Sequence, residues 1–175
     1  MNDRTEDESL NSVFIKDYIK EYFENETEEN AFMIYGQLML RVCEGGKAPM
    51  PLMNITSVAL SLDPDADAKD MFTDIPDSEL YVKIKGKNGR YWLPLFTDRS
   101  EMQELADTNP VKEVPIKEIF ELAHSLPGLN GVLINPFTDG FTLVQEQLSI
   151  MLETEPDWKE ALENAQRSAQ AGETD

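Results

Sequence analysis

The dipeptide Asn88-Gly89 in "LYVKIKGKNGRYWLPLF" limits the possible folds of this chain more than any other short feature. It separates two apolar and aromatic runs, and in that context Asn-Gly favours a β-hairpin, because both central residues of a type I′ turn take positive φ. We therefore expect strands at about residues 79–85 and 90–96, joined by a structural turn at Asn88 and Gly89.

Other strand patterns lie on both sides of this hairpin. The segment "APMPLMNI" has prolines at positions 49 and 51, which cannot donate to a ladder, so it predicts an edge strand or an extended entry. In "SVALSL" apolar and small residues alternate, which is typical of a strand with one buried face. We also expect a short strand at "VKEV".

The stretch "GVLINPFTDGFTL" predicts a second hairpin with a loop at residues 135–140. Pro136 ends the first strand and favours extended geometry at Asn135. Gly140 takes the left-handed conformation from which the chain returns, so Pro136 and Gly140 are expected to be structural turn residues. Loop tips often carry function. The hypothesis for a partner-binding site consists of Asn135, Phe137, Thr138 and Asp139.

Helical patterns surround the strands. Residues 10–24 and 28–42 are amphipathic and predict a helical hairpin, with Asn25 or Thr27 as the cap of the second helix. Its expected shared face consists of Phe32, Tyr35, Met39 and Val42. Short helices are expected at "SEMQELAD", capped by Asp98 or Ser100, and at "PIKEIFELAHSL", with Pro115 in its first turn. Two helices are expected at the C-terminus, "LVQEQLSIML" and "DWKEALENAQRSAQA".

These patterns predict an α+β fold. A mixed, mostly antiparallel β-sheet is covered by helices, with an N-terminal helical hairpin and C-terminal helices. We expect a disordered acidic N-terminus at residues 1–9, a single domain at 10–170 and a disordered tail at 171–175.

Charge restricts the partners. The formal net charge is −19, from 34 acidic and 15 basic residues, so phosphate backbones and anionic lipids are repelled. We expect no nucleic-acid and no membrane partner. A basic protein partner fits the charge, although an acidic surface that only maintains solubility is the stronger interpretation. Cys43 is the only cysteine and the first residues lack a signal-peptide pattern, so we expect a cytoplasmic protein; a homodimer is compatible with the sequence.

Few residues suggest catalysis or metal binding. Carboxylates at positions 1, 3, 5 and 12 of an acidic stretch resemble a calcium loop, but Ala68 replaces the turn glycine, so the metal hypothesis is weak. Cys43 is expected to be a buried, inert thiol, and His124 is expected to contact the end of its helix. No catalytic residue and no cofactor are predicted. The weak metal candidates are Asp63, Asp65, Asp67 and Asp74.

One basic cluster stands out in this acidic chain. Around the first hairpin turn lie Lys83, Lys85, Lys87 and Arg90, with Tyr91 and Trp92. On a basic protein this cluster would suggest nucleic-acid binding. Here it favours a role in blunting a hairpin edge or in pairing with nearby carboxylates.

The phrases "LYVKIKGKNGRYWLPLFTDRSEMQEL" and "VPIKEIFELAHSLPGLNGVLINPFTDGFTLVQEQLSIML", in this order, resemble the SseB N-terminal domain family. This bacterial family is named for enhanced serine sensitivity. The resemblance covers about residues 35–152 and is most specific in "GVLINPFTDGFTL". It implies an α+β domain with a mixed sheet and supplies no established catalytic residues.

Three functional hypotheses follow. The first is a non-catalytic cytosolic protein-interaction module whose loops, chiefly 63–78 and 135–140, face a partner. The family name suggests an alternative, a small-molecule binder or enzyme linked to amino-acid (serine) metabolism. The resemblance also implies a third, an immunity protein of a bacterial toxin system.

Overall fold

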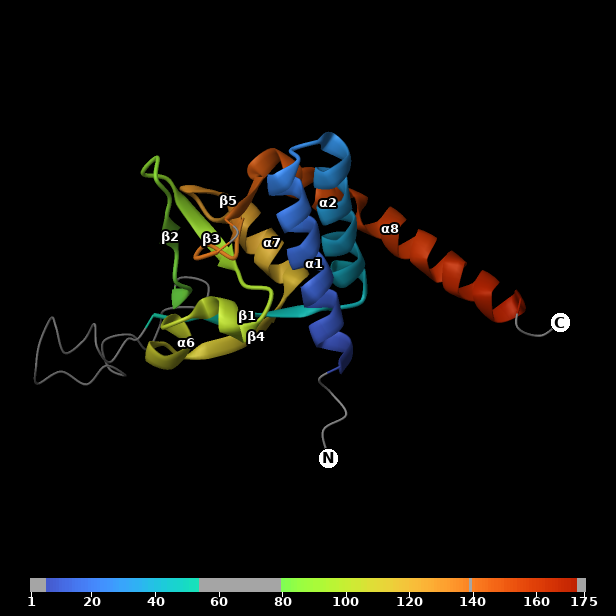
Figure 1. Ribbon diagram of the computed structural model, residues 1–175, viewed down its shortest axis with the longest axis horizontal. Helices are drawn as coiled ribbons and strands as arrows, with labels where there is room; N and C mark the ends of the chain where they lie inside the picture. The colour runs from blue at the N-terminus through green and yellow to red at the C-terminus, as the bar shows by residue number, and fades with distance from the viewer. Residues whose placement is uncertain (1–5, 54–79, 139, 173–175) are drawn as a thin grey trace, which may run out of the picture.

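The computed structural model describes residues 6–53, 80–138 and 140–172, and in residues 6–14 it describes the backbone only. Helices α1 (Glu6–Glu24) and α2 (Glu28–Cys43) lie side by side as the predicted N-terminal hairpin (Figure 1). Thr27, one of the two expected caps, begins α2, and its hydroxyl oxygen accepts a hydrogen bond of 3.2 Å from the backbone N–H of Asn30. This bond satisfies one of the unpaired donors of the first helical turn.

The buried face of α2 differs in part from the expected one. Met39 and Val42 are buried as predicted, together with Ile34 and Leu38. Phe32, however, is 64% exposed, so its assignment to the core face was wrong. Apolar residues occupy four consecutive positions from residue 32, and periodicity alone therefore could not select which of them faces inward.

The strands form two sheets, and the predicted α+β architecture is confirmed. A two-stranded antiparallel sheet pairs the expected proline-containing edge strand with the "VKEV" strand. The four-stranded sheet has the order β2-β3-β5-β6, in which only the β3–β5 pair is parallel. The expected strand "SVALSL" lies outside the described residues. The strands are β1 (Lys47–Pro51), β2 (Ile84–Lys85), β3 (Tyr91–Leu95), β4 (Val111–Pro115), β5 (Leu129–Ile134) and β6 (Phe141–Val144).

The first hairpin is confirmed, but β2 covers only Ile84–Lys85 of the expected residues 79–85, and the turn is not the expected type I′. Among the described residues only Gln103 and Asn135 combine a positive φ with a side chain, so Asn88 does not take the left-handed conformation. Gly89 does, at φ +76°. The backbone N–H of Gly89 bonds to the carbonyl of Gly86 at 3.0 Å, and Asn88 Oδ1 accepts from the N–H of Arg90 at 3.1 Å. The turn is therefore longer, and Asn88 stabilises it through its side chain.

Between β3 and β5 the chain passes through a 3₁₀ turn, η1 (Arg99–Met102), a short helix, α6 (Leu105–Thr108), strand β4 and helix α7 (Ile116–Ser125). Asp98 is the cap of η1, as one of the two alternatives predicted. Pro115 precedes α7 and serves as its N-terminal boundary. This crossover is what allows β3 and β5 to run parallel.

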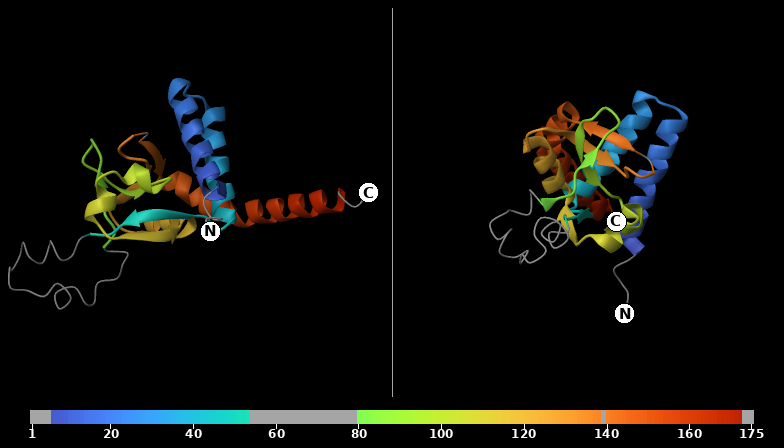
Figure 2. Two further views of the ribbon diagram at one scale, coloured as in Figure 1. Left: turned by 60° about the horizontal axis from the view of Figure 1, so that its bottom comes forward. Right: turned by 90° about the vertical axis from the view of Figure 1, so that its left-hand side faces the viewer.

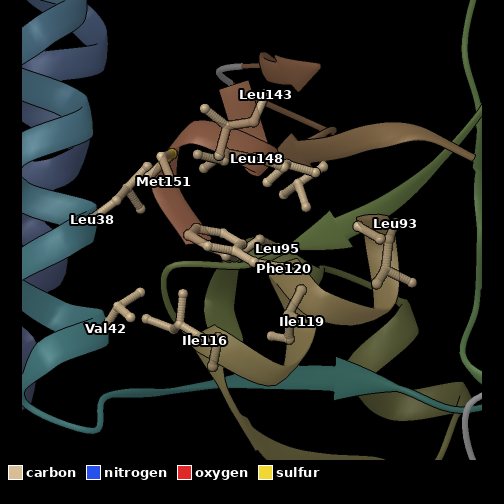
Figure 3. Packing of buried hydrophobic residues seen from close by; sticks show 14 of the residues in the cluster. Leu38, Val42, Leu93, Leu95, Ile116, Ile119, Phe120, Leu143, Leu148 and Met151 are labelled. Atoms are coloured by element: carbon tan, nitrogen blue, oxygen red, sulfur yellow. The ribbon is translucent and has the colours of Figure 1, made fainter. Parts of the chain in front are cut away.

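The core lies between the inner face of the four-stranded sheet and helix α7 (Figure 3). Leu93 and Leu95 of β3 point to the same side as Val132 and Ile134 of β5, because alternate side chains of a strand share a face. Ile119 and Phe120 of α7 pack against them, and all are almost completely buried. Leu148 and Met151, from the start of the last helix, close the core toward α2 (Figure 3).

The C-terminal segment is one helix, not the expected two. Helix α8 spans Gln145–Gly172 and contains Pro156. A proline removes one backbone hydrogen bond from a helix interior, yet good helix formers on both sides let this helix continue. Trp158 packs near Gly36 of α2, whereas residues 163–172 are exposed. The second half of α8 projects away from the rest of the molecule (Figures 1 and 2).

Candidate functional site

The carboxyl ends of the parallel strands β3 and β5 lie side by side, and Asn135 immediately follows β5. Its φ is +45° and its side chain is fully buried. The expectation of extended geometry before Pro136 was therefore wrong. Asparagine tolerates the left-handed region better than most residues, and it adopts this region where the surrounding contacts compensate for the cost.

The contacts of Asn135 join the two strand ends. Its backbone N–H donates to the carbonyl of Leu95 at 3.0 Å, which extends the β3–β5 pairing by one bond. Its Oδ1 accepts from the backbone N–H of Thr97 at 3.0 Å, and its Nδ2 donates to Thr97 Oγ1 at 3.0 Å. The carbonyl of Asn135 accepts from the N–H groups of Thr138 and Gly140. Asn135 therefore connects the loop both to the end of β3 and, through its carbonyl, to the N–H groups of two later loop residues.

A charged cluster adjoins this loop. Thr138 Oγ1 donates to Glu101 Oε2 at 2.6 Å, and the other oxygen of Glu101 contacts Lys16 Nζ from α1. Lys16 also pairs with Asp98 at 3.1 Å. Asp98 in turn accepts hydrogen bonds from the hydroxyl of Ser100 and the backbone N–H of Glu101. The cluster ties α1, η1 and the loop together.

The titration behaviour of the cluster favours a structural role. Burial alone would lower the pKa of Lys16, but the hydrogen bonds to Glu101 and Asp98 outweigh burial and raise it. A lysine that acts as a nucleophile needs the opposite shift, toward a neutral amine. Burial alone would raise the pKa of Asp98, but hydrogen bonds from Ser100 and Lys16 outweigh it and lower that pKa. Both groups are therefore held in their charged forms.

This arrangement predicts a pH dependence of stability that a single substitution should remove. Because the pKa of Asp98 is lower in the folded state, its contribution is present above its unfolded pKa and is lost as the pH falls through the folded value. In Asp98→Asn the capping oxygen remains while the charge is lost. We expect urea midpoints of the wild type and Asp98→Asn to differ at pH 7, to approach each other as the pH falls below the unfolded pKa of about 3.9, and to meet only below the lowered pKa of the folded state.

The matched control for this experiment is Asp98→Ala. Alanine removes the cap as well as the charge and should cost about 1 kcal/mol more than asparagine at every pH. A constant difference between the wild type and Asp98→Asn across pH 3–7 would show that the ion pair with Lys16 does not stabilise the fold.

The remaining described residues of the loop differ in exposure and in backbone conformation. Phe137 is 43% exposed, and its ring centroid lies 6.0 Å from that of the buried Phe96. Gly140 takes the predicted left-handed conformation at φ +66°. Asp139 lies outside the described residues. Of the four residues predicted to bind a partner, Phe137 and Thr138 lie at the surface, Asn135 is buried, and Asp139 is the one that is not described.

A groove of about 570 Å³ lies on the other side of this loop. Trp92 and Leu133 point into it from the outer face of the sheet, opposite to the face that packs on α7. Pro136 and Gly140 form one part of its wall and Phe23 of α1 forms another. The basic cluster identified in the sequence contributes Lys85 and Lys87.

Cys43 and His124, the two residues considered for catalysis in the sequence, both have environments that favour a structural role. Burial raises the pKa of the half-buried Cys43, with Glu155 adding to the rise, which disfavours the reactive thiolate. His124 Nδ1 lies 3.0 Å from Gln145 Oε1, and Gln145 Nε2 donates to the carbonyls of Ala123 and Leu129, so this pair links α7 to α8.

The metal hypothesis concerns residues that the structure does not describe, since Asp63, Asp65, Asp67 and Asp74 all lie between residues 53 and 80. In the described ranges, no group of three or more histidine, cysteine or acidic side chains is arranged to hold a metal ion. Each helix in those ranges is too short or too polar to cross a bilayer.

Sequence reasoning missed the cluster formed by Lys16 and Glu101. The two residues lie 85 positions apart, and neither differs in local pattern from the many other charged residues of the chain. Asp98 was recognised only as a cap. A pairing between residues so distant leaves no periodic signal in one sequence.

Comparison with known proteins supplies a family. No curated protein and no solved structure matches the chain. The profile of the SseB protein N-terminal domain matches residues 58–149, slightly more than half of the chain. The matched residues contain the hairpin β2–β3, helix α7, the loop 135–140 and both strands that enclose it. The chain belongs to the SseB protein N-terminal domain family.

Proposed function

We propose that this protein is a non-catalytic interaction module of the cytoplasm that binds a partner protein through the loop 135–140, with Phe137 as its apolar anchor. The observation that carries this proposal is an aromatic side chain that is 43% exposed in a loop whose first residue, Asn135, is fully buried and hydrogen-bonded and whose Thr138 is bonded to Glu101. Aromatic residues are enriched among the few side chains that dominate protein interfaces.

Preorganisation supports the proposal. Binding is weakened by the entropy lost when a flexible loop becomes ordered, and a loop that is already fixed avoids most of that loss. Asn135, the first residue of this loop, is bonded to Thr97 at the end of β3. Thr138, later in the loop, is bonded to Glu101 of η1. Phe137 lies between these two attachment points, with its ring against Phe96.

The chemistry of the adjoining polar residues also supports a binding role over a catalytic one. Lys16, Glu101 and Thr138 satisfy one another, and the raised pKa of Lys16 keeps it protonated. A general base or nucleophile needs an available lone pair near neutral pH. The polar groups of this cluster are instead engaged in holding the loop.

Phe137→Ala is expected to weaken partner binding at least about tenfold, because truncation of an anchoring aromatic commonly costs 2 kcal/mol or more. The melting temperature should change little, because nearly half of the side chain is already in water. The partner is first identified with a photo-crosslinking phenylalanine analogue at position 137, in the cells that make the protein. Its dissociation constant is then measured by titration calorimetry.

Phe32 provides the matched control, because it is also an exposed phenylalanine but lies on α2 and outside the loop. The same analogue at position 32 should capture no specific protein, and Phe32→Ala should leave the measured affinity unchanged. Equal crosslinking at both positions, or a Phe137→Ala variant that unfolds while its folded fraction binds normally, would contradict the proposal.

A further inference from the structure

The outer face of the four-stranded sheet has an apolar floor. Ile84 of β2 pairs with Trp92 of β3, and Leu133 of β5 pairs with Pro94 of β3 and Thr142 of β6. These residues alternate with the core residues Leu93, Val132 and Leu143, so they point away from α7. Ile84, Trp92, Leu133 and Thr142 all line the groove of about 570 Å³.

The ends of this floor come from separate parts of the chain. The β2–β3 turn contributes Gly86, Lys87 and Asn88, and the turn extends beyond the sheet at one end of the hairpin (Figure 1). On the other side stand the loop residues Pro136 and Gly140 and the 47% exposed ring of Phe23. The floor and walls together form a groove on the outer face of the four-stranded sheet, opposite to the face that packs against α7.

The charge of the groove is opposite to that of the chain. Acidic residues outnumber basic ones by 34 to 15 over the whole sequence. Among the described residues that line the groove, however, the charged ones are Lys85 and Lys87, and none is acidic. Both lysines are exposed, and Lys85 lies 6.0 Å from the ring centroid of Tyr91. A negatively charged ligand group is therefore attracted to this face and repelled by most others.

A further donor faces the same groove. The indole nitrogen of Trp92 lies so close to Gly86 that a Cβ at residue 86 would be 2.9 Å from it. Trp92 is 8% exposed and lines the groove, so a ligand seated on the floor would lie against its indole ring.

We propose that this groove binds an acidic segment of a partner protein, with one apolar side chain on the floor formed by Trp92 and Leu133 and neighbouring carboxylates beside Lys85 and Lys87. The proposal goes beyond the function assigned to Phe137, because it concerns a second surface on the opposite side of the loop. A partner that engaged both surfaces would gain affinity from their fixed spacing.

Nucleic acid fits the same surface poorly. A duplex carries about one negative charge per 1.7 Å, and such a polyanion extends far beyond two lysines into the surrounding acidic field. A short acidic segment keeps its charge within reach of Lys85 and Lys87. A basic segment would lie against these lysines and would find no carboxylate among the described lining residues.

The test uses a defined probe, the synthetic peptide Glu-Glu-Leu-Phe-Glu-Glu with blocked ends, added to the ¹⁵N-labelled full chain. The chain has two tryptophans, Trp92 and Trp158, so its indole N–H signals can be assigned with the variant Trp158→Phe. The expected result is a saturable shift of the Trp92 indole signal with an unchanged Trp158 signal. Parallel titrations use the same peptide with lysine in place of glutamate, free glutamate, and a single-stranded thymidine dodecamer.

Charge reversal identifies the groove as the site. Lys85→Glu and Lys87→Glu should each weaken peptide binding at least tenfold while leaving the fold intact, because both side chains are exposed. Lys159→Glu on α8 makes the same change of net charge away from the groove and should alter binding less than twofold. Phe137→Ala should also leave peptide binding unchanged, which keeps this test separate from the test of the loop.

The proposal is overturned if the acidic peptide leaves the Trp92 signal unmoved, or if Lys159→Glu weakens binding as much as Lys85→Glu. Preferential binding of the lysine peptide or of the oligonucleotide would also overturn it. Binding of free glutamate as tightly as the peptide would show a small-molecule site in place of a docking groove. None of these results bears on the role of Phe137, which does not line the groove.

Discussion

Gly131→Ala is expected to destabilise the domain by more than about 4 kcal/mol, an effect at the extreme end for single substitutions. Gly131 lies in β5 opposite Val144 of β6, with φ at +143°. A Cβ at this position would lie 1.9 Å from the carbonyl oxygen of Leu143 and 2.9 Å from its carbonyl carbon. Both atoms belong to the backbone, so no rotamer change can remove the collision.

Relief of this collision would require β6 to move away from β5. Phe141 and Leu143 of β6 are buried in the core, and Phe141 also contacts the rings of Tyr22 and Tyr35 from the N-terminal hairpin. A displaced β6 would therefore disturb the packing of α1 and α2 as well as the sheet. Since total stabilities are about 5–15 kcal/mol, a large fraction of the variant should be unfolded at physiological temperature.

Gly140→Ala is the matched control, because residue 140 also has a positive φ, at +66°, but among the described residues, its chain neighbours aside, no atom lies within 4 Å of its Cβ position. This variant has only the conformational cost of about 1–2 kcal/mol. Urea unfolding followed by circular dichroism at 222 nm measures both. If Gly131→Ala costs no more than Gly140→Ala, the close approach of β5 and β6 does not constrain residue 131.

The sequence predicted the hairpins because their signals are local. Gly89 and Gly140 take the positive φ values that the turn patterns require, and the alternating residues of β5 and β6 select their buried faces. The resemblance that was most specific in "GVLINPFTDGFTL" agrees with the family match over residues 58–149. In the same stretch, Gly131 is constrained by the neighbouring strand and Asn135 by Thr97.

The candidate site was less predictable because its key contacts join distant segments. Helix α1 lies outside the residues that match the family, yet it contributes Lys16 to the charged cluster and Phe23 to the groove. An amphipathic pattern indicates which face of such a helix is apolar, but not which loop it meets. The direction of Phe32 was mispredicted for a related reason, since four successive apolar residues leave the helical phase undetermined.

Asn135 shows how a tertiary contact overrides a local rule. The residue before a proline is normally extended, so extended geometry is the local expectation for Asn135, and its place in a loop suggests a side chain that faces a partner. In the structure its amide group bonds to both the N–H and the hydroxyl of Thr97, and this pairing is possible only when the side chain points inward. The conformational cost of φ +45° is offset by contacts that the local sequence does not reveal.

Asn135→Ala is therefore expected to cost about 4–6 kcal/mol, and Asn135→Gly about 1 kcal/mol less. Both variants lose the two hydrogen bonds to Thr97, each worth about 1 kcal/mol, and both leave the Thr97 N–H without its acceptor, which costs about 1–3 kcal/mol more. Glycine alone accepts the left-handed conformation freely, so the difference between the two variants isolates the backbone term.

A third variant separates the two hydrogen bonds. Thr97→Val removes the hydroxyl but keeps the backbone N–H that donates to Asn135 Oδ1, so it should cost only about 1 kcal/mol. The order expected from urea unfolding is Asn135→Ala, then Asn135→Gly, then Thr97→Val, from largest to smallest loss. In Asn135→Gly the amide proton of Thr97 should also exchange faster with solvent, because its acceptor is gone. If Asn135→Gly is as stable as the wild type, then asparagine is needed here only for its backbone conformation, and the loop 135–140 is held by other contacts.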